Sequence, residues 1–124
     1  MKKLFFIFVL LFSISIAKAE VFKYNAYQGR VYYEGNWTEW DSCDISIRVI
    51  NNVVKVYNPI VQNYKIITEI VEYNYYNRTE YICKALDNNN IKVKLSFKII
   101  NNGLIQLWIE YSNTKIIYNI KIDE

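Results

Sequence analysis

Residues 31–44, VYYEGNWTEWDSCD, combine aromatic and acidic side chains in one short stretch. Clustered tryptophan and tyrosine beside carboxylates suit a carbohydrate platform or a protein-binding hot spot. We therefore predict that Tyr33, Trp37 and Trp40 bind a ligand or a partner. Strict strand alternation would place Trp37 and Trp40 on opposite faces, so they act together only if this segment is not a regular strand. The alternative is that one tryptophan closes the end of a barrel while the acids solvate a loop.

The same stretch offers oxygen ligands for a hard cation such as calcium. The candidates are Asn36, Glu39, Asp41 and Asp44. Their spacing lacks the regular alternate ligands and the central glycine of an EF-hand loop. We therefore expect no metal at this site.

Catalysis would have to rely on carboxylates, because the chain contains no histidine. Ser-His-Asp and Cys-His sites are excluded, and so are histidine-ligated metals. Two acid pairs could support glycoside hydrolysis at a suitable separation, namely Glu69 with Glu72 and Glu34 with Asp41. We rank an enzyme below a binding protein and expect no cofactor.

The N-terminus has the pattern of a secretory signal peptide. Met1-Lys2-Lys3 precedes the apolar run LFFIFVLLFSISI, and Ala17-Lys18-Ala19 fits a cleavage site. The apolar run is shorter than the ~20 residues of a membrane span, and no later segment is long enough. We predict a signal peptide over 1–19, a single domain over 20–124, and an exported protein that is periplasmic or secreted.

The net charge of +3 belongs to the signal peptide. Loss of Lys2, Lys3 and Lys18 leaves 12 basic residues against 12 acidic residues. A neutral domain lacks the basic footprint of a nucleic-acid-binding protein. We therefore expect the partner to be a small ligand, a glycan or an envelope protein.

Cys43 and Cys83 are the two cysteines of the chain. In an exported protein, a pair of cysteines indicates one disulfide. We predict a Cys43–Cys83 disulfide in preference to free thiols.

Residues 91–122 predict three consecutive antiparallel strands. Apolar and lysine residues alternate over 91–99, which is the period of a half-buried strand. A three-residue turn ending at Gly103 pairs Ile100 with Leu104 and sets Lys94 opposite Glu110. A second turn at Ser112-Asn113 gives the same inward face. Agreement between turn chemistry and side-chain pattern favours this register.

The second hairpin also places Trp108 opposite Ile117 on the outer, otherwise polar face. Exposed apolar residues of this kind are usually covered by another element of the fold or form a binding surface. We expect an N-terminal strand to cover them, with a dimer contact as the alternative.

The remaining chain continues the strand pattern. We predict one or two strands over 21–37, a hairpin over 44–58 with an Asn51-Asn52 turn, a long bent strand over 64–76, and a strand over 79–86. About eight short strands predict an all-β fold, either a small antiparallel up-and-down barrel or a curved sandwich.

These features favour a non-enzymatic exported binding domain with its ligand or glycan at the Trp37/Trp40 end. Gly35-Asn36-Trp37 is similar to the Gly-x-Trp sequence near the first strand of lipocalin-like barrels, over three residues. Tyr81-x-Cys83 before a lysine-rich strand is similar to bacterial lysozyme inhibitors, with a different cysteine order. That likeness motivates the alternative of a protein-binding inhibitor of a cell-envelope enzyme, with a carboxylate-based hydrolase in third place.

Overall fold

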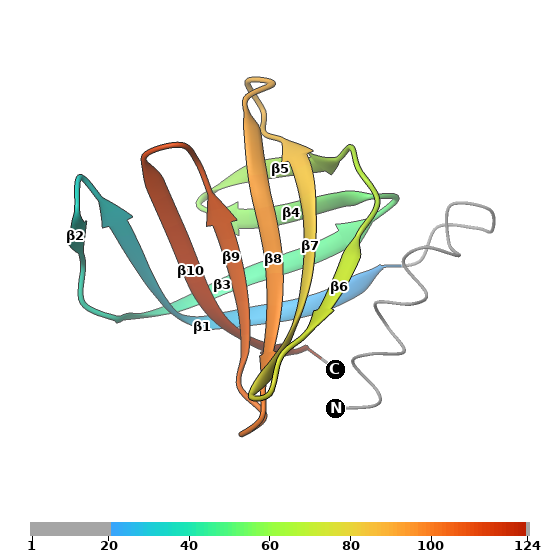
Figure 1. The fold of residues 1–124 in the computed structure, drawn as a ribbon. Coiled ribbons are helices and arrows are strands. Elements are labelled where there is room, and N and C mark those ends of the chain that lie inside the picture. Colours follow the sequence, from blue (N-terminus) through green and yellow to red (C-terminus); the bar gives the residue numbers. More distant parts are fainter. Residues whose placement is uncertain (1–20, 124) are drawn as a thin grey trace.

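The computed structural model describes residues 21–123, so the predicted signal peptide at 1–19 lies outside the described residues. The described chain is built from strands, which form a closed antiparallel barrel with two short extensions (Figure 1). The strands are β1 (Phe22–Tyr33), β2 (Asn36–Trp37), β3 (Asp41–Ile50), β4 (Val53–Asn58), β5 (Ile60–Ile66), β6 (Val71–Asn74), β7 (Arg78–Leu86), β8 (Lys92–Ile100), β9 (Ile105–Glu110) and β10 (Thr114–Ile122).

Eight of these strands make the barrel wall in the order β10-β9-β8-β7-β5-β4-β3-β1. Pairing of β1 with β10, from Tyr24 opposite Ile122 to Tyr33 opposite Thr114, closes the wall. Closure removes the exposed edges that an open sheet would have. The all-β prediction is confirmed, and of its two architectures the structure has the barrel.

The predicted registers of the C-terminal hairpins are confirmed. Lys94 lies opposite Glu110 across β8 and β9, and Glu110 lies opposite Lys115 across β9 and β10. Gly103 has a φ of 92°, and its N–H donates to the Ile100 carbonyl. Both residues of the Asn51-Asn52 turn also have positive φ, as a type I′ hairpin requires.

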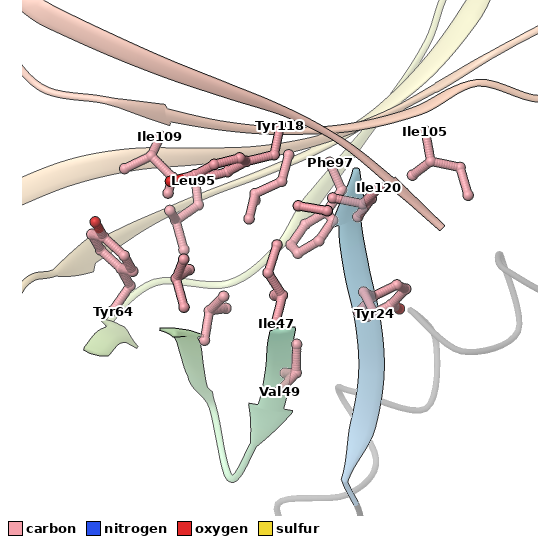
Figure 2. Close-up of a cluster of buried hydrophobic side chains, with 14 of the residues drawn as sticks. Tyr24, Ile47, Val49, Tyr64, Leu95, Phe97, Ile105, Ile109, Tyr118 and Ile120 are labelled. Atoms are coloured by element: carbon pink, nitrogen blue, oxygen red, sulfur yellow. The ribbon is translucent and has the colours of Figure 1, made fainter. Parts of the chain in front are cut away.

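Inward-facing side chains of all eight wall strands fill the middle of the barrel. Figure 2 shows Leu95, Phe97 and Ile109 from one side of the wall facing Ile47 and Val49 from the other. Leu95 and Ile47 are fully buried. A barrel of this size has an interior that side chains just fill. The centre of the barrel is therefore the hydrophobic core.

The predicted strand over 64–76 is divided in two. Residues 67–70 leave the strand conformation between β5 and β6, and both strands then pair with the same edge of β7. The Thr68 hydroxyl accepts a hydrogen bond from the Lys84 N–H at the break. The expected bend is present. It places β6 beside β7 as a short strand outside the eight-strand order of the wall.

The predicted disulfide is wrong. Cys43 on β3 and Cys83 on β7 are free thiols, separated along the wall by β4 and β5. Neighbouring strands are about 4.8 Å apart, whereas a disulfide needs Cα atoms within roughly 7 Å. Cys83 points into the core, and the Cys43 thiol donates to the Ala26 carbonyl 3.4 Å away. An even cysteine count gave no information on where the two strands lie around the barrel.

We expect two reactive thiols per chain when the protein is alkylated in denaturant without reductant. In the native state the reaction is slow, because burial raises the pKa of Cys83 to about 12 and also raises the pKa of Cys43. The thiolate is the reactive form, and it is scarce at neutral pH. Intact-mass measurement gives the adduct count. No adduct in denaturant would contradict the separate placement of the two sulfurs.

We expect Gly103→Val to lower the free energy of unfolding by about 1–2 kcal/mol more than Asn113→Ala does. No heavy atom lies within 4 Å of a Cβ built on Gly103, so the cost is backbone strain at positive φ. Asn113 makes only a side-chain contact with Thr114, at 3.3 Å. Urea denaturation of both variants measures the difference. Equal midpoints would contradict the strained turn.

Candidate functional site

The β1–β2 hairpin brings the predicted aromatic residues to one end of the barrel. Glu34 and Gly35 both have positive φ, which is the geometry of a tight two-residue turn. The turn returns Trp37 opposite Tyr32, with the two ring centroids 5.0 Å apart. Figure 1 shows this hairpin projecting beyond the barrel wall. It is the element that positions the site.

Trp37 and Trp40 converge on Arg30. The Arg30 guanidinium carbon lies 4.6 Å from the Trp37 ring centroid and 5.2 Å from that of Trp40. Residues 38–40 lie outside the strands, so the alternation that would separate the two indoles does not apply. Trp37 is 39% exposed and Trp40 is half-buried. Trp37 is therefore the more exposed of the two tryptophans.

Trp37 also covers the apolar patch on the outer face of the barrel. Its ring centroid lies 6.2 Å from that of Trp108, in an edge-on arrangement. Trp108 pairs with Ile117, which is only 3% exposed. The Lys98 ammonium lies 3.5 Å from the centre of the Trp108 ring. The N-terminal hairpin therefore covers Trp108 and Ile117, as expected from the sequence.

A row of amides fixes the outer surface below this aromatic cluster. The Trp108 indole N–H donates to Gln106, the Gln106 amide donates to Asn119, and the Asn119 amide donates to Gln28. The distances are 2.9, 3.0 and 2.9 Å. The row links β9, β10 and β1, and it holds Trp108 behind Trp37.

A cavity of about 270 Å³ opens at the barrel mouth beside the hairpin. Its lining residues come from β1, β3, β4 and β10 and from Thr38, and they include both apolar and polar side chains. The lining residues that carry polar side chains are Arg30, Thr38, Asp41, Cys43, Asn58 and Tyr118.

The polar groups of this cavity include both donors and acceptors. The Asn58 amide donates to the Tyr118 hydroxyl over 3.3 Å, which leaves the Tyr118 proton free to donate. Burial raises the pKa of Tyr118, while the Asn58 hydrogen bond opposes that rise. The phenol is therefore protonated at neutral pH. Asp41 adds a carboxylate acceptor to the same rim.

Tyr33, the third predicted binding residue, does not join this cluster. It is 52% exposed and follows Tyr32 on β1, so alternation turns its ring away from Trp37. Its strand partner is Thr114.

The predicted acidic candidates are not gathered into a cation site. Among residues 21–123 there is no group of three His, Cys, Asp or Glu side chains that could hold a metal ion. Asp44 instead accepts a hydrogen bond from Asn25 over 2.7 Å. Asp41 lines the mouth cavity without Glu34.

The other acid pair, Glu69 and Glu72, also fails to share a cavity. Glu69 lines a separate groove of about 500 Å³ along β6 and β7, and Glu72 is not among the residues lining that groove. Glu72 accepts from Asn74 over 2.8 Å.

Sequence reasoning missed Arg30, Asn58 and Tyr118. The signal for Arg30 was present, because Arg30 and Tyr32 are alternate residues of one strand and so share a face. Asn58 and Tyr118 come from β4 and β10, which are not neighbours in the wall. Their approach depends on closure of the barrel.

No protein-family model, curated protein or solved structure matches this chain. Residues 21–123 contain no helix with the length and apolar character needed to cross a bilayer. The site must therefore be interpreted from its own geometry.

Proposed function

We propose that this protein is a non-enzymatic binding domain that binds carbohydrate at the barrel mouth beside Trp37 and Trp40. Two observations carry the proposal. The cavity of about 270 Å³ has Arg30, Asp41, Asn58 and Tyr118 among its lining residues. The Arg30 guanidinium lies against two tryptophan rings on the outer side of the same wall. Its setting is outside the cytoplasm, on the strength of the signal-peptide pattern at residues 1–19.

A sugar ring matches this arrangement in two ways. Its hydroxyl groups both donate and accept, and the rim offers the Asp41 carboxylate as an acceptor and the Arg30 guanidinium as a donor. Its C–H faces are apolar, and an indole offers an apolar face of similar size with a polar N–H at the edge. Few convergent polar groups on a largely apolar concave surface are typical of small-molecule sites.

The size of the cavity limits what can enter. Small-molecule sites are usually 300–1,000 Å³. A cavity of about 270 Å³ is therefore suited to one ring of a glycan rather than to a large ligand. Because side chains such as Leu95 and Phe97 fill the barrel interior, the rest of the glycan would lie outward over Trp40 and Trp37.

Calorimetric titration with neutral and uronic acid tetrasaccharides tests the proposal. We expect saturable binding of at least one tetrasaccharide, weakened about tenfold by Asp41→Asn because a charged acceptor contributes roughly 1.5–3 kcal/mol. Asp123→Asn, at the far end of the chain, is the matched control and should bind like the parent. Absence of binding by every tetrasaccharide would overturn the proposal, as would parent-like binding by Asp41→Asn.

A second candidate, binding of an envelope protein, is favoured by β6. This strand pairs with β7 on one edge and with no other strand among residues 21–123. Val71 and Tyr73 on β6 are 47% and 46% exposed and line the groove of about 500 Å³. A free strand edge beside apolar side chains suits an added strand from a protein. Muramidase inhibition that survives Asp41→Asn and is lost in Tyr73→Ala would favour this candidate.

A further inference from the structure

Arg30 is a cation without an anion. Its guanidinium lies against Trp37 and Trp40, and its Nε atom is buried with no hydrogen-bond partner. The Arg30 side chain forms no hydrogen bond or ion pair with any residue in the part of the chain that the structure describes, 21–123. A buried polar group normally has a partner, so this one calls for an explanation.

Three lysines on the outer surface around Trp108 do have anionic partners. Lys94 and Lys115 reach the Glu110 carboxylate at 3.7 and 3.8 Å, and Lys98 lies 4.0 Å from Glu80. Arg30 and Asp41 are both lining residues of the mouth cavity, yet no ion pair joins them. The Arg30 guanidinium therefore lies against two indole rings with no carboxylate among residues 21–123 to neutralise it.

We infer that Arg30 is the receptor for an oxyanion carried by the bound glycan, so that the ligand class is acidic sugars with a carboxylate. This inference rests on the proposed carbohydrate site and specifies its substrate. A guanidinium is a planar fork that matches a carboxylate with two parallel hydrogen bonds. The two indole rings hold the guanidinium in place and exclude water around it, which strengthens its attraction to a carboxylate.

Asp41 sets the direction in which an acidic sugar enters. Its carboxylate accepts from sugar hydroxyls but repels a second carboxylate, so the charged end of the ring belongs on the Arg30 side of the cavity. The pair thus distinguishes one orientation of an acidic ring from the reverse. A sulfate ester has the same oxyanion chemistry, and the experiment separates it from a carboxylate.

Tetragalacturonate and its methyl ester are matched probes, because they share rings and linkages and differ only in charge. We expect the parent protein to bind tetragalacturonate at least tenfold more tightly than the ester, with the difference shrinking as salt is raised. Arg30→Gln should remove this preference, so that the variant binds acid and ester alike. Arg48→Gln is the matched control, since Arg48 also lies over an aromatic ring, that of Tyr57, on another part of the barrel.

The outcomes separate this inference from the proposed function. Equal binding of acid and ester by the parent would overturn the inference and leave the carbohydrate site intact, as would a preference that survives Arg30→Gln. Tighter binding of a sulfated carrageenan tetrasaccharide than of tetragalacturonate would keep Arg30 as the oxyanion receptor and overturn the carboxylate assignment. Binding of no tetrasaccharide would overturn the proposed function itself. Near-UV circular dichroism of Arg30→Gln verifies that the tryptophan cluster is still folded.

Discussion

Leu107→Ala is expected to lower the free energy of unfolding by about 3 kcal/mol, the largest effect on stability among the changes considered. Leu107 is fully buried on β9, where it is paired with Phe97 on one side and Tyr118 on the other. Truncation removes apolar burial and leaves a cavity in a filled barrel, because the closed wall cannot collapse onto the site. A loss of this size is a large share of the 5–15 kcal/mol that stabilises a typical domain.

Leu104→Ala provides the matched control for this change. Leu104 is half-buried in the β8–β9 turn, so the same substitution removes less burial and opens no enclosed cavity. Thermal unfolding measures both variants, with a shift of roughly 4–8 °C expected for each kcal/mol. If the two variants unfold at the same temperature, Leu107 is not part of a closely packed core.

Trp40→Ala is expected to have the largest effect on binding, a loss of affinity of tenfold or more. Buried aromatic anchors contribute about 2 kcal/mol or more at hot spots, and tenfold corresponds to 1.4 kcal/mol. Trp40 directly precedes Asp41 in the chain, and its ring centroid lies 5.2 Å from the Arg30 guanidinium carbon. Its removal takes away a stacking surface and leaves the guanidinium free to move.

The control for Trp40→Ala is Trp108→Phe. Trp108 lies behind Trp37 and is held by Gln106, so it supports the hairpin. Titration with the tightest-binding tetrasaccharide should show near-parent affinity for Trp108→Phe. An equal loss in both variants would mean that Trp40 acts through the fold of the hairpin rather than through contact with a ligand.

The sequence predicted the hairpins because two independent signals agreed at each one. At Gly103, a residue that tolerates positive φ coincided with alternation that continued on both sides of the turn. Closure of the barrel was harder to predict, since the same alternation fits a curved sandwich. Pairing of β1 with β10 joins residues from opposite ends of the described chain, and no local pattern encodes that contact.

The candidate site was only partly predictable for the same reason. Trp37 and Trp40 stood out by residue type, but the Arg30 cation that both rings contact was not expected. The predicted disulfide failed because spacing along a chain does not specify position around a barrel, and Cys43 and Cys83 are on strands that are not neighbours. Tyr33 was predicted to be a binding residue because it is close to Trp37 in the sequence. Strand alternation places its side chain on the other face of β1.

The most direct test of the barrel-mouth site is a nuclear magnetic resonance titration that follows the three tryptophan indole N–H signals. On addition of the tightest-binding tetrasaccharide, the Trp40 and Trp37 signals should shift. The Trp108 signal, whose N–H is hydrogen-bonded to Gln106, should move least. Backbone signals of Asp41 and Asn58 should shift with the first two. Unchanged Trp37 and Trp40 signals, with shifts confined to β6 and its groove, would contradict the account and place the binding surface on β6.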